Sequence, residues 1–401
     1  MITLETVRQA RDRIRDRVLQ TPLVHSPTLS QRFGAQIRLK LENLQKTGSF
    51  KIRGATHKLL AQADAIGPNG VVAASAGNHA QGVALAARSA GVDATIVMPT
   101  WASISKQEAT RSYGGKVVID GDSVEESLRR AMALADEGRT FIHPFDDPEI
   151  IAGQGTIALE ILEDGPDTDL IIVPVGGGGL IAGIALAAKS IRPNIRVVGV
   201  QAARCPSGRE SRRKGQRVRV DAKSSIADGI SVKQTGAHPF DLIQTHVDDI
   251  VLVDEEDIAS AILMLLERKK ILAEGAGATP LAALLAGVVP LPAGGRVVLL
   301  ISGGNVDSPL LGRILNKGLV KNGRIMRLSV QLSDTPGSLA RLLDRIADHQ
   351  ANVLHIRHER HLREMPLYTT GVELELETRG ADHIETIRAD LEGAGYGVRV
   401  G

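Results

Sequence analysis

Early in the chain the sequence reads Thr47-Gly48-Ser49-Phe50-Lys51-Ile52-Arg53-Gly54-Ala55. This stretch places Lys51 directly after a small-residue turn and beside the aromatic ring of Phe50. Desolvation at such a position keeps an amine neutral, and a neutral amine forms a Schiff base with a carbonyl compound. Lys51 is therefore a candidate nucleophile. Taken alone, the stretch favours a simpler interpretation, a surface charge that opens a helix through about Ala65, and two later Gly-rich turns reverse that preference.

From Val71 onward, short apolar segments alternate with helical segments rich in Ala and Leu. Strands are expected at residues 71–75, 95–98, 116–119, 170–175, 196–200, 250–253 and 297–302, after an earlier one at 36–41. Such alternation predicts βαβ units and parallel sheets covered by helices on both faces. We therefore expect an α/β protein with two open lobes whose ligand lies beyond the carboxyl ends of the strands.

Two turns follow expected strands and open expected helices. The first is Ser75-Ala76-Gly77-Asn78-His79, where free backbone N–H groups would bind a substrate carboxylate and Asn78 would donate to a cofactor oxygen. An ordinary N-cap is an equally good interpretation of this turn, and His79 is best interpreted as a structural histidine. The second contains Gly176, Gly177, Gly178 and Gly179, whose N–H groups can converge on a phosphate. A flexible hinge is the alternative there.

Two further polar residues belong to the same expected edge of the sheets. Ser302 follows the last strand of the larger lobe, where its hydroxyl can bond a ring nitrogen or can simply belong to a turn. Glu274 can face the ligand or can cap a helix, and the residues leave these two options open.

Composition restricts the class of protein. The chain of 401 residues is too long for one core, and 43% hydrophobic with 23% charged residues is typical of soluble globular proteins. Aromatic residues at 2% and a net charge of +2 argue against a nucleic-acid partner. A single cysteine, Cys205, and the absence of a signal peptide or spanning segment predict a cytoplasmic protein without a membrane association.

The motifs together, in this order, strongly resemble those of the threonine dehydratases (threonine ammonia-lyases). These are fold-type II pyridoxal-phosphate enzymes of the tryptophan synthase β-like superfamily. The resemblance runs from the first helix to about Gly312. Residues 325–401 form a βαββαβ pattern that resembles an ACT regulatory domain. The expected domains are thus a catalytic domain at 1–315, with a smaller lobe at roughly 46–145, a linker at 316–324 and a regulatory domain at 325–401.

The resemblance implies a role for each motif. Lys51 would hold pyridoxal 5'-phosphate as a Schiff base and remove the Cα proton, with Phe50 packed against the cofactor ring. The remaining cofactor contacts would come from Asn78, the four glycines 176–179 and Ser302. The substrate would be bound by Ser75, Ala76, Gly77, Asn78 and His79.

The implied reaction is β-elimination and deamination of L-threonine to 2-oxobutanoate and ammonia, with L-serine to pyruvate as a side activity. A serine racemase, a hydroxyaspartate dehydratase and a non-catalytic amino-acid sensor are the alternatives. Racemases of this kind carry a serine where this chain has Ala76, so racemisation is not expected. Gln201 and Ser207 are neutral where those relatives bind a divalent cation, so no metal is expected.

An ACT-like unit also implies assembly and control. Its open sheet edge predicts a homodimer or homotetramer. The expected effector is a branched-chain amino acid, isoleucine or valine, as in a pathway of isoleucine biosynthesis. It would bind at a paired interface through the loop that contains Asp334, Pro336 and Gly337, together with Asn352.

Overall fold

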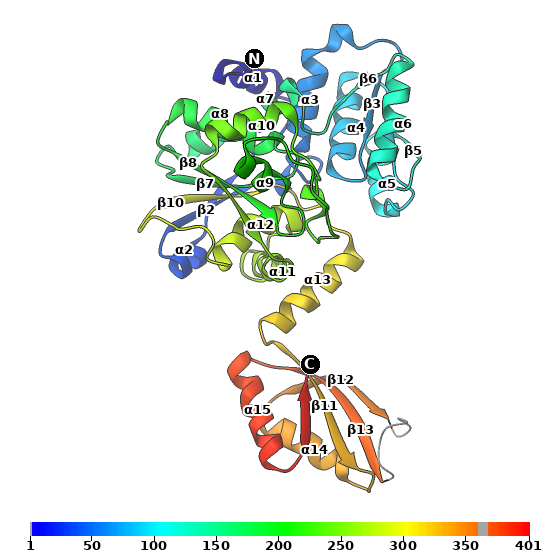
Figure 1. The fold of residues 1–401 in the computed structure, drawn as a ribbon, viewed down its shortest axis with the longest axis vertical. Coiled ribbons are helices and arrows are strands. Elements are labelled where there is room, and N and C mark those ends of the chain that lie inside the picture. The colour runs from blue at the N-terminus through cyan, green and yellow to red at the C-terminus, as the bar shows by residue number, and fades with distance from the viewer. Residues whose placement is uncertain (1, 360–367) are drawn as a thin grey trace. The chain divides into compact units, whose positions relative to one another are not determined.

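The computed structural model describes residues 2–359 and 368–401 (Figure 1). The chain separates into two compact units, Met1–Leu311 and Gly312–Gly401. The first unit contains two α/β lobes, each built around its own open sheet. No helix within the described residues is long and apolar enough to span a membrane.

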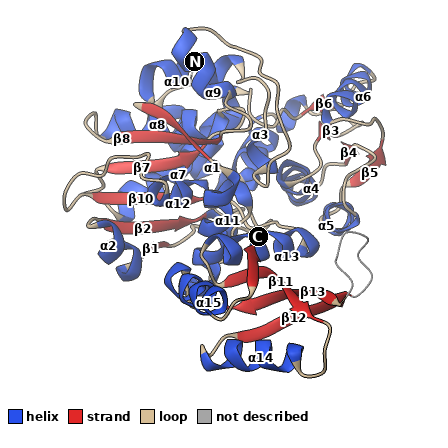
Figure 2. Cartoon of the chain, turned by 60° about the horizontal axis from the view of Figure 1, so that its bottom comes forward, coloured by secondary structure: helices blue, strands red, loops and turns tan. Residues whose placement is uncertain are grey.

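The larger lobe contains a six-stranded sheet (Figure 2). Across the sheet the strands are β1 (Leu23–His25), β2 (Gln36–Leu41), β10 (Arg296–Ile301), β7 (Leu170–Pro174), β8 (Arg196–Ala202) and β9 (Asp249–Val253). Only β1 pairs antiparallel, and the other pairings are parallel. The carboxyl ends of the parallel strands therefore lie on one edge of the sheet.

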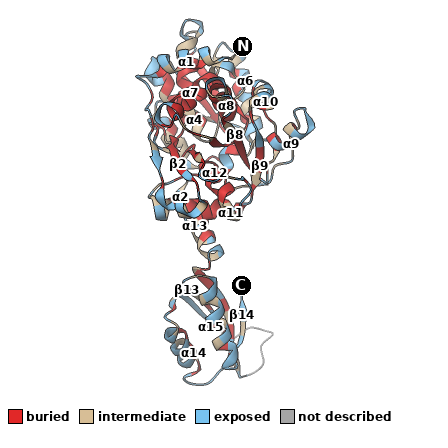
Figure 3. Ribbon diagram, turned by 90° about the vertical axis from the view of Figure 1, so that its left-hand side faces the viewer, coloured by how far each residue is buried: buried red, intermediate tan, exposed pale blue. Residues whose placement is uncertain are grey.

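Helices cover both faces of this sheet. The first face packs against α1 (Leu4–Ile14), α7 (Pro148–Asp164), α8 (Gly179–Ile191) and α10 (Ala237–His246). The second packs against α12 (Gly275–Leu285), which in turn contacts α11 (Glu255–Met264). Successive strand residues such as Ile171 and Ile172 point to opposite faces, yet both are fully buried. Figure 3 shows buried residues gathered in α7, α8 and the neighbouring strands, as expected for a parallel sheet with two covered faces.

The smaller lobe has four parallel strands. In spatial order they are β5 (Lys116–Ile119), β4 (Ala94–Met98), β3 (Val71–Ala74) and β6 (Thr140–Phe141). One face packs against α3 (Lys51–Ala61) and α4 (Asn78–Ala90), and the other against α6 (Val124–Asp136). A further helix, α5 (Ile104–Ser112), lies between β4 and β5 in the chain.

The second unit is an antiparallel sheet with two helices on one face. Its strands lie in the order β12 (Asn352–Glu359), β13 (Thr369–Glu377), β11 (Ile325–Ser333) and β14 (Gly397–Val400). The helices α14 (Ser338–Asp348) and α15 (Ala381–Gly393) pack on the apolar side chains of β11 and β13. This is the βαββαβ, ferredoxin-like arrangement that the sequence predicts.

The expected α/β class is thus confirmed, and the differences are local. The structure adds two short strands that the sequence did not predict, β1 and β6, because two or three residues are too few for a periodic pattern. Helix α13 (Ser308–Lys321) continues into the segment expected as a linker, 316–324.

A buried ionic cluster joins α3 to the larger lobe. The guanidinium of Arg53, 1% exposed, donates to Glu42 at 2.8 Å and to Glu160 at 2.6 and 2.8 Å. Lys40 donates to the same Glu160 carboxylate at 2.5 Å. Two cations face two carboxylates, so the cluster is neutral as a whole. Arg53 therefore fixes the first turn of α3 on the larger lobe.

Replacing Arg53 by alanine is expected to lower the free energy of unfolding of the first unit by about 3–5 kcal/mol, because it leaves two buried carboxylates with one cation. Denaturant unfolding followed by circular dichroism measures the change. The control is Arg15→Ala, which removes an exposed arginine paired with Asp12 and should leave the midpoint almost unchanged. Equal effects of the two substitutions would contradict the role given to Arg53.

Candidate active site

Lys51 is the first residue of α3, and its amine lies in an enclosed position. Its Nζ donates to the carbonyl oxygen of Pro144 at 2.8 Å and lies 5.2 Å from the centre of the Phe50 ring. Burial lowers the pKa of the Lys51 amine to about 8, and the carboxylate of Glu274 opposes this shift. A substantial fraction of the amine is thus neutral at mildly alkaline pH, as a nucleophilic lysine requires.

Backbone hydrogen bonds tie the Lys51 turn to the end of β10. The N–H of Phe50 donates to the carbonyl oxygen of Ser302 at 3.0 Å, and Ser49 forms an isolated bridge with Gly303. Gly48 has a φ of +70°, and a Cβ there would lie 2.3 Å from Oδ1 of Asn305. Only glycine fits this turn, which brings the lysine stretch and the Ser302 turn together.

The turn after β3 also contacts the turn that follows β10. The Oδ1 atom of Asn78 accepts from Nδ2 of Asn305 at 2.8 Å. Ser75 Oγ accepts from the N–H of Gly77 at 3.2 Å. The ring of His79 donates from Nε2 to the carbonyl oxygen of Ile142 at 2.9 Å, and its burial lowers its pKa to about 3. His79 is therefore a neutral, structural histidine, as the sequence favoured.

The tetraglycine turn lies against the segment that receives the Lys51 amine. A Cβ on Gly177 would come within 2.3 Å of the Phe145 ring, and one on Gly179 within 2.7 Å of the Phe145 carbonyl oxygen. Gly178 has a φ of +98°. The first N–H groups of α8 have no acceptor within their helix, so they are available to an anion.

Glu274 is the residue whose role the sequence left open. It occupies the N-cap position of α12, but its side chain caps nothing there. Its two carboxylate oxygens instead accept from Nδ2 of Asn78 at 2.8 and 2.9 Å. Burial raises the pKa of Glu274 to about 7, against the effect of the Asn78 hydrogen bonds. Glu274 thus faces the site rather than its own helix.

Sequence reasoning missed the segment His143-Pro144-Phe145-Asp146. The carbonyl oxygen of Pro144 accepts a hydrogen bond from the Lys51 amine, and Phe145 lies against the glycine turn at Gly177 and Gly179. The His143 ring accepts from the N–H groups of Phe145 and Asp146, which fixes the bend. The sequence His-Pro-Phe gives little indication of a binding role. Every residue has a backbone carbonyl, so the residue type does not show which carbonyl accepts a hydrogen bond from a functional side chain.

The residues proposed for an effector are not all brought together within one chain. Ser333, at the start of the proposed loop, pairs with Thr369 at one end of β13. Asn352 pairs with Glu377 at the other end of that strand. Eight residue-to-residue steps along β13 separate these positions by roughly 27 Å. A ligand that touches both Asn352 and the loop would need two chains, so a paired interface stays a prediction.

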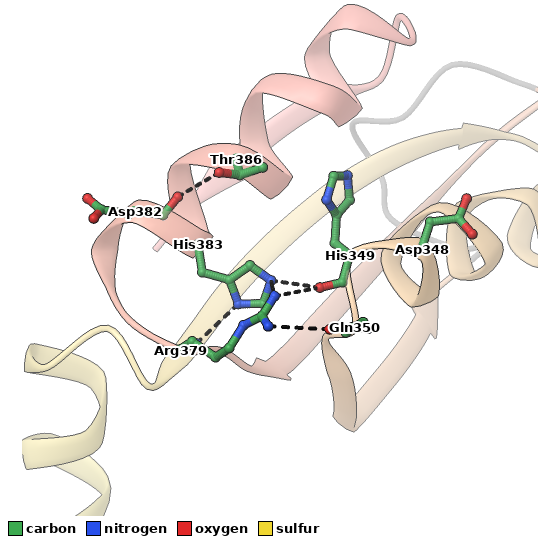
Figure 4. A pocket seen from close by; sticks show the side chains of 7 residues that line it. All are labelled: Asp348, His349, Gln350, Arg379, Asp382, His383 and Thr386. Carbon is green, nitrogen blue, oxygen red and sulfur yellow. Dashed lines mark hydrogen bonds between the residues drawn. The ribbon is translucent and has the colours of Figure 1, made fainter.

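A cavity of about 340 Å³ lies elsewhere in the second unit (Figure 4). Its polar groups bind one another. The His383 ring lies 2.8 Å from the carbonyl oxygen of His349, and Arg379 donates to the Gln350 side chain at 3.3 Å. These contacts join the end of α14 to the start of α15, and the cavity contains none of the residues singled out in the sequence.

The residues of the first unit fit pyridoxal phosphate. They offer an amine with a lowered pKa, a glycine turn closed to side chains, and three buried hydroxyls without a hydrogen-bond partner among the described residues, Thr47 Oγ1, Ser49 Oγ and Thr235 Oγ1. Thr235 lies beside Gly178, and Ser49 beside Gly303.

No group of three or more potential metal ligands occurs in the described part of the chain. Gln201 is used internally, since its Oε1 accepts the N–H of Arg209 at 2.9 Å.

Comparison with known proteins agrees with this fit. Residues 14–303 match the family described as pyridoxal-phosphate dependent enzyme. The L-threonine ammonia-lyase of Thermotoga maritima is 48% identical over 401 residues, the full length of both chains. The catabolic L-threonine dehydratase of Escherichia coli K12 is 44% identical over 78% of this chain and 96% of its own.

Solved structures also resemble the first unit. The processed form of threonine deaminase isoform 2 from Solanum lycopersicum is 34% identical and superposes with a TM-score of 0.72 over 78% of this chain and 93% of its own. Maize serine racemase is 36% identical, with a TM-score of 0.75 over 80% of this chain and 99% of its own.

The lowered pKa of Lys51 predicts its reactivity. In cofactor-free protein, labelling of Lys51 by trace acetic anhydride should rise with pH and reach half its maximum near pH 8, because only the neutral amine reacts. Mass spectrometry of the Lys51 peptide measures this from about pH 6 to about pH 11, beside a reference peptide whose lysine titrates near 10.4. A Lys51 profile that coincides with the reference would contradict the desolvated position.

Proposed function

Because the chain belongs to the family of pyridoxal-phosphate dependent enzymes, we propose that it is an L-threonine ammonia-lyase that converts L-threonine to 2-oxobutanoate and ammonia. L-Serine, which lacks only the methyl group, would be a lesser substrate and would give pyruvate. The full-length identity to enzymes with this name supports the substrate. The observation that carries the chemistry is the Lys51 amine, held between the Ser302 turn and the Pro144-Phe145 segment.

Bound pyridoxal phosphate would supply an electron sink for the bond that breaks at Cα. The residues of the chain supply the rest. Lys51 would hold the cofactor through Nζ until the substrate amine takes its place, and the amine of Lys51 thus set free would act as the base that takes the Cα proton. Gly176 to Gly179 would bind the phosphate, and the 2% exposed Ser302 would bond the ring nitrogen without adding a negative charge. Departure of the β-hydroxyl as water and hydrolysis of the released enamine complete the conversion.

Substrate recognition is proposed for the turn after β3. Ser75, Ala76 and Gly77 precede α4, and Asn78 and His79 form its first positions. N–H groups at this helix start favour a carboxylate. Asn78 would in addition donate to the ring oxygen of the cofactor.

A serine racemase is the second candidate, since racemases are among the structural relatives. Racemisation needs a proton donor on each face of Cα. The methyl group of Ala76 packs against the apolar core of the smaller lobe and offers no proton. Elimination is therefore favoured over racemisation.

The second unit is proposed as a regulatory domain. An open sheet edge is usually covered by another strand, so a homodimer or homotetramer that meets partly through residues after Ile325 is our proposal. Isoleucine or valine would bind near Asp334, Pro336 and Gly337.

A cytoplasmic location is proposed from the single cysteine, which fits a reducing compartment.

The catalytic proposal predicts that purified protein releases 2-oxobutanoate from L-threonine faster than pyruvate from L-serine, and forms little D-serine. Lys51→Ala should lose turnover by at least a thousandfold, because the base and the attachment point are the same amine. Keto acid and chiral amino-acid assays on one sample measure all products. The proposal would be contradicted if Lys51→Ala eliminated water from threonine at a near-normal rate. Efficient D-serine formation by the unaltered protein would contradict it as well.

The regulatory proposal predicts that truncation after Lys321 leaves elimination active but removes its response to isoleucine and valine. Allosteric couplings are typically about 1–3 kcal/mol, which corresponds to a 5- to 150-fold change in affinity. Initial rates against threonine, with and without each amino acid, compare the full chain and the truncated one. Full-length enzyme that is indifferent to every branched-chain amino acid would refute the effector and leave a domain for assembly.

A further inference from the structure

Asn305 follows the Ser302 turn, and its side chain is held in one orientation. Its Nδ2 donates to the backbone carbonyl oxygen of Thr47 at 2.7 Å. A carbonyl oxygen can only accept, so the nitrogen end of this amide must face Thr47. The oxygen end lies against Gly48, where a Cβ would come within 2.3 Å of Asn305 Oδ1. The Asn305 amide therefore cannot be reversed without losing its hydrogen bond to Thr47.

The second N–H of Asn305 sets the orientation of Asn78. An amide nitrogen carries two hydrogens, and Nδ2 of Asn305 lies 2.8 Å from Oδ1 of Asn78. The same nitrogen lies 3.4 Å from Oε1 of Gln81, which is a longer and weaker contact. A reversed Asn78 amide would bring two N–H groups face to face. The Thr47 carbonyl thus fixes Asn305, and Asn305 in turn fixes Asn78.

This orientation leaves one N–H of Asn78 available. Nδ2 of Asn78 lies 2.8 and 2.9 Å from the two oxygens of Glu274. The two hydrogens of a trigonal nitrogen diverge, so one carboxylate takes only one of them. The other hydrogen has no acceptor among the described residues. Under the proposed function, it is the donor to the ring oxygen of the cofactor.

Glu274 alone does not enforce this orientation. An ionised carboxylate only accepts, but a carboxylic acid also has one O–H donor. Burial raises the pKa of Glu274 to about 7, so both forms occur near neutral pH. The acid form can donate to the oxygen of a reversed Asn78 amide, whereas the amide donors of Asn305 do not titrate. Asn305 is thus the contact that specifies the Asn78 orientation whatever the protonation state of Glu274.

Resting on the proposed cofactor, we propose that Asn305 is a positioning residue that orients the free N–H of Asn78 toward the ring oxygen of pyridoxal phosphate. The hydrogen bonds run from the Thr47 carbonyl through two amides to the cofactor. They connect the turn before Lys51 with the turns that follow β10 and β3. Asn305 acts on the cofactor through Asn78 and not directly, so its effect must disappear when the Asn78 amide is removed.

The test compares pyridoxal phosphate with 3-deoxypyridoxal phosphate, an analogue that lacks the ring oxygen. Absorbance titration of cofactor-free protein gives both dissociation constants, and the ratio of the analogue's constant to the cofactor's reports the ring-oxygen contact. Asn78→Ala should lower this ratio by about tenfold, as expected for a hydrogen bond to an ionised oxygen. Asn305→Ala, which keeps the backbone N–H that stabilises ionised Glu274, should lower it by at least about threefold. The double variant should match Asn78→Ala alone.

A second variant and a matched control accompany these proteins. Asn305→Asp keeps the size of the side chain and replaces the donor nitrogen by an oxygen, so it should lower the ratio at least as far as Asn305→Ala. The control is Asn43→Ala, which removes another asparagine amide beside the same turn. Asn43 donates to the carbonyl oxygen of Leu272 at 3.1 Å and lies against Gly304, so its loss should leave the ratio unchanged.

A wild-type ratio in both Asn305→Ala and Asn305→Asp would overturn the inference. A double variant whose ratio falls below that of Asn78→Ala by the full Asn305 effect would also overturn it, because the two residues would then act independently. The same holds for an unchanged ratio in Asn78→Ala, or for an equal fall in the Asn43→Ala control. Failure of the wild-type protein to bind pyridoxal phosphate at all would instead overturn the proposed function, and the inference with it.

Discussion

The hydrogen bond from the Phe50 N–H to the Ser302 carbonyl oxygen connects the two parts of the site. It joins the start of α3 to the carboxyl end of β10 at 3.0 Å and thereby brings Lys51 to the edge where the strands of the larger lobe end. The amine is then held from the other side by the carbonyl of Pro144. A neutral carbonyl satisfies the donor without stabilising its charge as a carboxylate would. The enclosure can therefore lower the pKa of Lys51 while leaving the amine hydrogen-bonded.

The buried charged groups of the first unit have two different roles. Some hold the fold together, and others face the candidate active site. Arg53, two residues after Lys51, is surrounded by Glu42 and Glu160 and cannot reach a ligand. Its cluster holds the helix that carries Lys51 in place. Glu274 has no such partner cation bound to it, and its only side-chain donor among the described residues is the amide of Asn78. One buried ionic group is thus balanced by cations, whereas burial raises the pKa of the other, Glu274, to about 7.

The sequence predicted those features that depend on local pattern. Strand and helix alternation indicated the two parallel sheets, and the positions of Lys51, Asn78 and Ser302 after turns placed them at one edge. The roles of Glu274 and Pro144 depend on which distant segments meet, and 196 residues separate Glu274 from Asn78. No periodicity reports such a contact. The short strands β1 and β6 were not predicted for a different reason. They are recognised as strands by their pairing with β2 and β3, and their composition does not indicate it.

The central claim is that one desolvated amine, that of Lys51, carries the cofactor. It is tested most directly by reducing the protein with borohydride in the presence of pyridoxal phosphate and mapping the labelled lysine by peptide mass spectrometry. Reduction makes the attachment permanent, so the label marks the lysine that was bound. The expected result is stoichiometric label on Lys51 alone. Label on Lys106, or spread over several lysines without preference for Lys51, would contradict the site.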